Sequence, residues 1–225
     1  MAKAPFEPRP EDLPERIPIF PLSGVLLLPR GRLPLNIFEP RYLAMIRDAL
    51  AAPQRLIGMI QPRDDHSHGA GVIPGEPDIC PVGCAGRIVS FAETGDGRYL
   101  IELKGVARFA VMSDMMGNKL YRSAIADWSR YRGDLDEAPK FIDRDKLIAV
   151  LKPYFQHLGV NTDWRALEAM MDDRLVNTVA MLSPFAPQEK QALLEAEDTK
   201  ARGDLLIALI EMAVKANAGP PTQVN

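Results

Sequence analysis

The spacing of apolar residues changes once along this chain of 225 residues, and that change restricts the fold more than any other feature. As far as residue 128, apolar and polar residues tend to alternate, which is typical of strands with one buried face. Beyond residue 140, apolar residues recur at every third or fourth position, which is typical of amphipathic helices. A polar stretch over residues 129–140 separates the two patterns. The sequence therefore predicts an α+β fold, in which a β domain precedes a helical domain.

Prolines restrict the β domain further. Ten of the twenty prolines in the chain lie before residue 55. Because proline interrupts long helices and central strands, we expect short extended segments at residues 17–20, 25–28 and 32–35. Pro40 is suited to the first turn of a helix, and Pro53 ends the apolar stripe that follows it. The β domain is therefore expected to contain one or two helices.

A long β-hairpin is the clearest element of the β domain. Residues 82–93 and 98–112 flank Thr94–Gly97, a sequence typical of a tight turn. The second arm alternates between an apolar face (Tyr99, Ile101, Leu103, Ala107, Phe109 and Val111) and a polar face (Glu102, Lys104 and Arg108). We expect the apolar face to be buried and the polar face to be hydrated. Gly105 interrupts the apolar row and indicates a β-bulge.

Several short helices are expected after residue 140. Their starts are marked by residues that cap helices or open the first turn, namely Asp143, Thr162 or Asp163, Pro187 and Asp198. Pro153 is expected to kink the first helix. Short loops between amphipathic helices are typical of a small antiparallel helical bundle. The patterns together divide the chain into a flexible arm (1–16), the β domain (17–128), a connector (129–140), the helical bundle (141–218) and a flexible tail (219–225).

Composition and charge argue against two classes of partner. The formal charge is −3, with 17 Lys and Arg against 15 Asp and Glu in residues 1–133, and 10 against 15 in residues 134–225. Neither part is basic enough to indicate binding to phosphate backbones, so we expect no nucleic-acid partner. The longest apolar runs, Val25–Leu28 and Leu205–Ile210, are too short to cross a bilayer. With two cysteines and no export signal, a cytoplasmic location is expected.

The motifs of ATPases and hydrolases are absent from the sequence. No Gly-Lys dipeptide occurs, so there is no phosphate-binding P-loop. Neither a Gly-x-Ser-x-Gly elbow nor a His-Glu-x-x-His zinc motif occurs. We therefore predict no catalytic residue, no cofactor and no enzymatic activity; a hydrolase of an unrecognised kind stays open as an alternative.

Two histidines and two cysteines lie close enough in the sequence to be considered as zinc ligands. His66, His68, Cys80 and Cys84 span nineteen residues, and two imidazoles with two thiolates suit tetrahedral zinc. However, this order of ligands is not that of a common zinc ribbon. We interpret the histidines as residues of a solvated loop and the cysteines as small packing residues, and we predict no metal site.

Carboxylate pairs are interpreted in the same way. Asp64-Asp65, Asp172-Asp173 and Glu195 to Asp198 lie in polar loops or at helix ends, where carboxylates cap helices or face solvent. Glu39 and Arg41 flank the proline that opens the first helix. We interpret them as a structural corner that joins this helix to the β domain, with the rim of a binding groove as the alternative.

Methionines at one predicted turn form a further candidate. Met115 and Met116 lie beside Asp114 and Gly117, where apolar side chains have little reason to occur. Methionine side chains adapt to varied apolar partners. An exposed apolar patch and simple packing of the loop are both open interpretations here.

Ordered blocks of the sequence resemble the N-terminal domain of the Lon protease family. The blocks are Ile19–Leu22, Leu28-Pro29, Leu33–Leu43, Arg55–Gly58, Pro81–Ile88, Gly97–Ile101, Asp163-Trp164, Arg174–Asn177, Pro184-Phe185 and Glu189–Leu194. The resemblance covers roughly residues 16–215. It implies a PUA-like mixed β-barrel domain followed by a helical bundle.

The resemblance also implies a function. In full-length Lon proteases this region helps to recognise substrates and to assemble the ring, and this chain ends where the ATPase and protease regions would begin. We therefore expect a non-catalytic module that binds polypeptide clients or a protease or chaperone partner. The alternatives are an adaptor or regulator of a Lon-type protease and a PUA-like RNA-binding protein. The candidate polypeptide-binding surface consists of Asn36, Phe38, Glu39, Arg41, Tyr42, Met115 and Met116.

Overall fold

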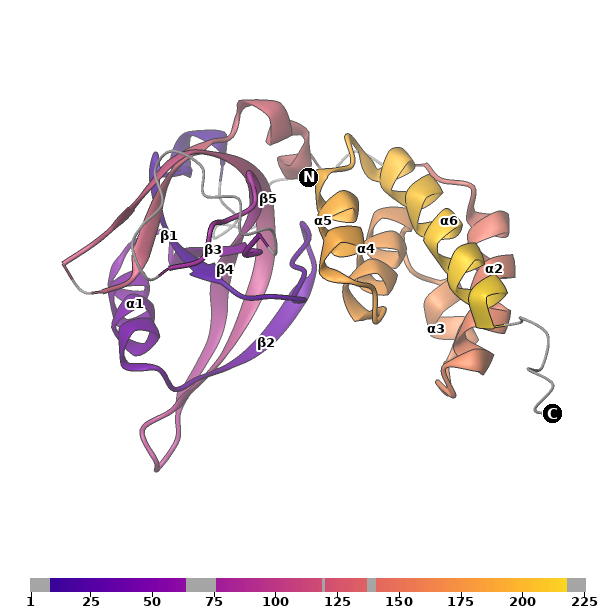
Figure 1. Ribbon diagram of the computed structural model, residues 1–225, viewed down its shortest axis with the longest axis horizontal. Helices are drawn as coiled ribbons and strands as arrows, with labels where there is room; N and C mark the ends of the chain where they lie inside the picture. The colour runs from indigo at the N-terminus through magenta and orange to yellow at the C-terminus, as the bar shows by residue number, and fades with distance from the viewer. Residues whose placement is uncertain (1–8, 64–75, 119, 137–140, 218–225) are drawn as a thin grey trace, which may run out of the picture. The chain divides into compact units, whose positions relative to one another are not determined.

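The computed structural model describes residues 9–63, 76–118, 120–136 and 141–217. It divides into two compact units (Figure 1). We call the first the barrel unit, which consists of Met1–Glu137 with Pro184–Leu194, and the second the helical unit, which consists of Ala138–Ser183 with Glu195–Asn225. The predicted α+β fold is therefore confirmed, with strands confined to the barrel unit.

The barrel unit contains one mixed sheet of six strands. Its elements are η1 (Pro10–Asp12), β1 (Arg16–Pro21), β2 (Arg32–Ile37), α1 (Pro40–Ala51), β3 (Leu56–Ile60), β4 (Val82–Glu93), β5 (Tyr99–Met116), β6 (Arg122–Asp127), η2 (Ser129–Leu135) and α5 (Pro187–Glu195). The strand order is β2-β5-β4-β3-β1-β6, and β6 also pairs with β5. This second pairing closes five strands into a barrel and leaves β2 outside the closed ring. Among the described strands, β1 and β3 form the one parallel pair, and the other pairs are antiparallel.

Strand β5 serves two neighbours because it is long and bent. Its residues Tyr99 to Lys104 pair with β2, and its residues Ala110 to Met116 pair with β6. Between these halves the register with β4 shifts, because Gly105 and Ala107 face consecutive residues of β4. The bulge predicted at Gly105 is therefore confirmed, and bulges bend a strand in the way that barrel closure needs.

The glycine at the bulge is also required by a close approach of the backbone. A Cβ atom added to Gly105 would lie 2.0 Å from the carbonyl oxygen of Leu28. Residues 25–28, for which we expected an extended segment, form no strand; they bury Leu26, Leu27 and Leu28 inside the barrel unit. This loop fills space that a side chain on Gly105 would need.

The core of the barrel consists of alternating side chains and one large ring. Ile17, Ile19, Ala107 and Ala124 are almost completely buried around Phe109. A Cβ atom on either Gly58 or Gly83 would lie 2.7 Å from Cζ of Phe109, so these neighbouring strands must carry glycine to accommodate the ring.

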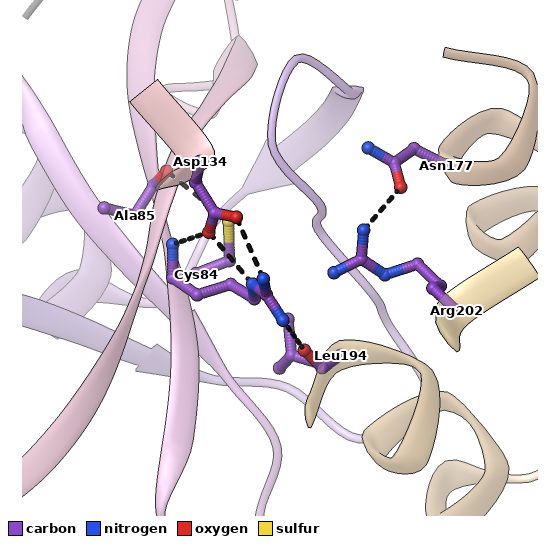
Figure 2. A network of polar contacts seen from close by, with 7 residues as sticks. Cys84, Ala85, Asp134, Asn177, Leu194 and Arg202 are labelled. Atoms are coloured by element: carbon purple, nitrogen blue, oxygen red, sulfur yellow. Dashed lines mark hydrogen bonds and ion pairs between the residues drawn. The ribbon is translucent and has the colours of Figure 1, made fainter. Parts of the chain in front are cut away.

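One buried ion pair corrects the expected hydration of β5. The alternation predicted that Arg108 faces solvent, but its side chain is only 3% exposed. Its guanidinium forms two hydrogen bonds of 2.9 Å with the carboxylate of Asp134 and donates to the carbonyl of Leu194 at 2.9 Å (Figure 2). It also lies over the ring of Tyr131. Asp134 and Tyr131 belong to η2, which forms within the polar stretch over residues 129–140. A buried arginine is tolerated here because its donors are matched by acceptors.

Helix α5 attaches to the barrel through polar contacts. Lys190 donates to the carbonyl of Gly24 at 2.7 Å, and Gln191 donates to the carbonyl of Val82 at 3.1 Å. Gln61, which follows β3, donates to the carbonyl of Pro187 at 3.0 Å. Burial lowers the pKa of the Lys190 ammonium below its ordinary value. These bonds, together with the Arg108 bond to Leu194, place α5 within the barrel unit.

The helical unit contains α2 (Arg144–His157), α3 (Trp164–Glu168), α4 (Asp172–Leu182) and α6 (Thr199–Asn217). The predicted caps are confirmed, because Asp143, Asp163 and Asp198 accept hydrogen bonds from backbone N–H groups of the first turns of α2, α3 and α6. Arg202 of α6 and Asn177 of α4, both buried, are joined by a hydrogen bond of 3.1 Å (Figure 2). None of the described helices has both the length and the apolar character needed to span a bilayer.

The close approach at the bulge predicts that Gly105→Ala destabilises the barrel unit. We expect the free energy of unfolding to fall by about 3 kcal/mol, because the added methyl group meets backbone that cannot move alone. Urea unfolding in a Trp164→Phe background measures this through Trp128, which packs on Phe109. Gly95→Ala is the matched control, since nothing lies within 4 Å of its added Cβ. Equal midpoints for the two variants would contradict the close approach.

The buried ion pair predicts a large effect for Asp134→Ala. The variant leaves the charge of Arg108 buried without its carboxylate, and we expect a loss of about 3–5 kcal/mol in the free energy of unfolding. Asp136→Ala, an exposed carboxylate one residue beyond η2, is expected to change stability by less than about 0.5 kcal/mol. The same fluorescence-monitored urea titration compares them, and a small effect for Asp134→Ala would show that the pair is dispensable.

Candidate polypeptide-binding surface

The corner between β2 and α1 contains five of the seven predicted surface residues. Arg41 bonds Glu39 at 3.1 Å and Glu76 at 2.5 Å, and its guanidinium lies 4.7 Å from the ring centre of Tyr42. Tyr42 is buried against Phe20, and burial raises the pKa of its hydroxyl. Asn36 and Phe38 are instead exposed. The corner therefore contains an internal polar cluster and, beside it, two side chains that a partner can reach.

The turn between β4 and β5 projects beyond α1 and the rest of the barrel unit (Figure 1). Thr94 closes this turn, because its N–H donates to the carbonyl of Arg98 at 2.9 Å and its hydroxyl contacts both Asp96 and Arg98. Gly97 adopts a φ of +79°, which is easy only for glycine. The turn sequence predicted for a hairpin thus holds two strands together past the end of the core.

Large apolar side chains lie exposed on this projecting arm and beside it. Phe38 is 62% exposed, Phe91 on β4 is 42% exposed and Leu100 on β5 is 47% exposed. We call these three residues the hairpin patch. Phe91 packs edge-to-face on Tyr99, and the Arg98 guanidinium lies 5.9 Å from the ring centre of Phe38. The three residues mark the part of the arm where a partner could contact exposed apolar side chains.

The alternation of the strands explains why the hairpin patch has members on two faces. Leu100 is the register partner of Asn36 and Ala92, whereas Phe91 is the partner of Ile101. Successive residues of a strand point to opposite faces, so Leu100 and Phe91 lie on opposite faces of the arm. Both faces are accessible because the arm extends past the barrel core.

Met115 and Met116 lie at the other end of β5, where it pairs with β6. Both are half-buried, while Met112, at a second register shift, and Leu120 are largely exposed. Leu100 and Met112 are twelve residues apart on β5, or about 40 Å along an extended strand. The structure therefore separates the predicted surface residues into two places.

Polar anchors hold the start of β6 beside this second place. The hydroxyl of Tyr121 donates to Asp48 of α1 at 2.7 Å, and burial with this bond raises the pKa of Tyr121 to about 12. Arg122 is paired with Asp114 at 2.5 Å. Met115 and Met116 thus flank a fixed structural corner, which fits packing of the loop as well as contact with a partner.

The other residues considered as sites do not gather in the described chain. Cys84 is buried in β4 and Cys80 is half-buried before it, while His66, His68, Asp64 and Asp65 lie outside the described residues. Asp172 pairs with Arg144 at 2.6 Å, and Asp198 caps α6. Within the described ranges, no group of three or more His, Cys, Asp or Glu side chains is arranged to hold a metal ion.

Phe91 and Leu100 were missed by the sequence analysis, although each left a signal. Leu100 is an apolar residue in the polar phase of β5, two positions before Glu102. Phe91 lies three residues after Ile88 and on the same face of β4, whereas simple alternation places residues of one face two positions apart. The register shift between Ile88 and Ser90 accounts for the extra residue. An apolar residue on the hydrated face of a hairpin arm is therefore the signal that identifies Leu100, and an apolar residue displaced by a register shift is the signal that identifies Phe91.

Solved structures define the class of this fold. The chain superimposes on the N-terminal domain of the Mycobacterium avium complex Lon protease with a TM-score of 0.62 and 16% identity, covering 87% of this chain and 98% of that one. A Lon N-terminal domain protein from Xanthomonas campestris gives a TM-score of 0.59 and 22% identity, covering 86% and 97%. The barrel and helices are therefore those of a Lon N-terminal domain.

The family follows from the sequence comparison. The model of the ATP-dependent protease La (LON) substrate-binding domain matches residues 16–212, and this chain belongs to that family. It is 27% identical to Lon protease 2 of Myxococcus xanthus over 203 residues, which are 89% of this chain and 24% of that protein. It is 24% identical to the Lon protease of Escherichia coli (strain K12) over 207 residues, 88% of this chain and 25% of that protein. The chain thus spans about a quarter of the length of these relatives, and the predicted resemblance is confirmed.

Proposed function

We propose that this chain is a polypeptide-binding module that holds exposed apolar segments of client proteins and does not itself cleave them. The observation that carries the proposal is the hairpin patch: Phe91 and Leu100 are exposed on the arm that projects beyond the core, and Phe38 is exposed beside it. Unfolded chains expose the apolar side chains that folded proteins bury, so such a patch distinguishes them from folded proteins.

The family supports the class of ligand. A substrate-binding domain of an ATP-dependent protease has polypeptides as its substrates, and this chain belongs to that family. The hairpin patch is small and has charged neighbours, including Arg98 and Glu93. A small patch with a charged rim favours reversible capture of many sequences over tight binding of one.

The non-catalytic part of the proposal rests on the sequence and on the matched region. The sequence contains neither a P-loop Gly-Lys nor a nucleophile elbow. The matched family model describes a domain for binding substrates. Incubation with a labelled unfolded protein is therefore expected to give complexes and no fragments.

The proposal predicts that Phe38→Ser with Leu100→Ser weakens binding of an unfolded protein at least about tenfold. An apolar side chain that passes from full exposure to full burial in a complex contributes about 1.5–3 kcal/mol. Phe38 and Leu100 are only partly exposed before binding, so each contributes a part of this free energy, and a tenfold change in affinity corresponds to about 1.4 kcal/mol. Fluorescence anisotropy of labelled, reduced and carboxymethylated α-lactalbumin measures the affinity. Leu182→Ser is the matched control, because Leu182 is 80% exposed in the helical unit. Unchanged affinity in the double variant, or no binding by the wild-type chain, would sink the proposal.

A second candidate function is delivery of captured clients to a Lon-type protease. The observation that favours it is the length of the relatives, in which the matched region is about a quarter of the chain and is joined to the other three quarters. We expect the tagged chain to recover a Lon-type protease from cells, and the recovery to survive the Phe38→Ser and Leu100→Ser changes. Recovery of clients without any protease complex would argue against delivery.

A further inference from the structure

Strand β2 has one edge that pairs with no described strand. It lies at the end of the sheet order and pairs with β5 alone, from Arg32 opposite Lys104 to Ile37 opposite Tyr99. Each of the remaining described strands has at least two neighbouring strands, counting the additional pairing of β5 with β6. An unpaired edge presents backbone N–H and C=O groups in a row, which is a template for another strand.

The hairpin turn determines which residues of β2 point to that edge. The N–H of Thr94 donates to the carbonyl of Arg98, so the backbone groups of Arg98 point to β4. Backbone groups of successive residues point to opposite sides of a strand. Those of Leu100 and Glu102 therefore also point to β4, and those of Tyr99, Ile101 and Leu103 point to β2. The N–H of Gly105, which donates to the carbonyl of Gly31, agrees with this alternation.

The same alternation applies to β2 itself. Leu33, Leu35 and Ile37 are the register partners of Leu103, Ile101 and Tyr99, so their backbone groups are directed to β5. Arg32, Pro34 and Asn36 then direct theirs to the free edge. All three residues are exposed. The position of Pro34 supports the assignment. Proline has no N–H to donate, so in a sheet it occurs at positions of edge strands whose backbone faces away from the neighbouring strand.

We propose that this free edge of β2 binds an extended segment of the client polypeptide as an additional strand. The inference rests on the proposed polypeptide binding and adds how the segment is held. The N–H and C=O groups of Arg32 and of Asn36, with the C=O of Pro34, form a row of donors and acceptors that lacks one donor, the N–H that proline does not have. An extended peptide backbone presents the complementary series at the same spacing, whatever its side chains.

Neighbouring side chains give this edge a preference for apolar segments. Phe38 follows directly after β2 and is exposed, and Leu33 and Leu35 are half-buried on the other face. A bound segment would place alternate side chains beside Leu33 and Leu35 and the intervening ones beside Phe38. Arg32 is already paired with Glu102 at 2.7 Å, so its charge is balanced within the sheet and the preference of the edge is for apolar side chains.

Pro34 makes a second copy of this chain a poor occupant. Suppose that the β2 edges of two copies paired with each other. In any register that pairs their outward residues, the Pro34 of each copy would face the other copy's backbone without an N–H to donate. The opposing carbonyl would then be left without a donor. A client segment without proline satisfies the same edge more fully, because its own N–H reaches the carbonyl of Pro34. The edge therefore suits a client strand better than self-association.

Backbone methylation of a peptide ligand tests the pairing directly. Overlapping peptides of α-lactalbumin are screened, and the tightest binder is resynthesised with a single N-methyl group at each position in turn. We expect binding to fall about threefold to tenfold at alternate positions only, since one side of an added strand faces β2. A dependence without this period of two would overturn the pairing, because side-chain contacts alone do not alternate with the backbone amides.

Two substitutions in β2 test the same edge from the protein side. Asn36→Pro removes an outward N–H and is expected to weaken peptide binding about threefold to tenfold, whereas Pro34→Thr adds one and is expected to strengthen it by a similar factor. Asn36→Ala is the control, because it changes the side chain and keeps the N–H. Circular dichroism and the Trp128 unfolding curve establish that each variant is folded.

The outcomes separate this inference from the proposed function. If the wild-type chain binds the unfolded protein but Pro34→Thr and Asn36→Pro bind it equally well, strand addition at β2 is overturned and polypeptide binding stands. If Phe38→Ser with Leu100→Ser abolishes binding while the methylation series shows no alternation, the hairpin patch binds through side chains alone. If the wild-type chain binds no peptide, both proposals fail.

Discussion

The buried contact of Arg108 joins three parts of the barrel unit that are distant in sequence. Its backbone and side chain bond Asp134 of η2, its guanidinium covers Tyr131 of the same helix, and it donates to Leu194 at the end of α5. The charge cannot return to water without opening this whole junction, since the side chain is almost completely enclosed. One arginine in the middle of β5 thus fixes both the segment that leaves the barrel and the helix that returns to it.

The same strand also determines where apolar side chains of the barrel unit are exposed. Because the junction at Arg108 and the bulge beside Gly105 fix the middle of β5, the two ends of the strand extend away from the core in different directions. One end carries the hairpin patch and the edge strand β2, and the other carries the methionines beside β6. Apolar side chains can be exposed on these arms without loss of stability, because the core is packed without them. The exposed apolar side chains of β5 therefore lie toward its two ends, and its middle is fixed by buried contacts.

Local patterns predicted the elements but not their long-range partners. The hairpin turn at Thr94–Gly97, the bulge at Gly105 and the caps at Asp143 and Asp198 could be predicted, because each depends on a few adjacent residues. The burial of Arg108 could not be predicted, because the groups that accept its hydrogen bonds come from two distant segments. The alternation of apolar and polar residues gives information only about positions along one strand. Of the candidate surface, Phe38 and Asn36 are exposed as such a surface requires, whereas Tyr42 is turned into the core by its contact with Phe20. Periodicity showed that residues 187–194 form a helix, but polar contacts decide which unit that helix joins.

An open strand edge is useful for capturing clients and dangerous for solubility, and β2 reconciles the two requirements in its own sequence. The edge is short and exposed, Arg32 places a charge at one end, and Pro34 interrupts the row of donors at its centre. These are the features by which natural sheets discourage pairing between identical edges. They weaken pairing with a second copy more than pairing with an unrelated extended chain, because only the copy brings a second proline. If this edge binds a client strand as proposed, the missing donor makes the backbone pairing weak, and burial of the exposed Phe38 ring beside it would supply the remaining affinity.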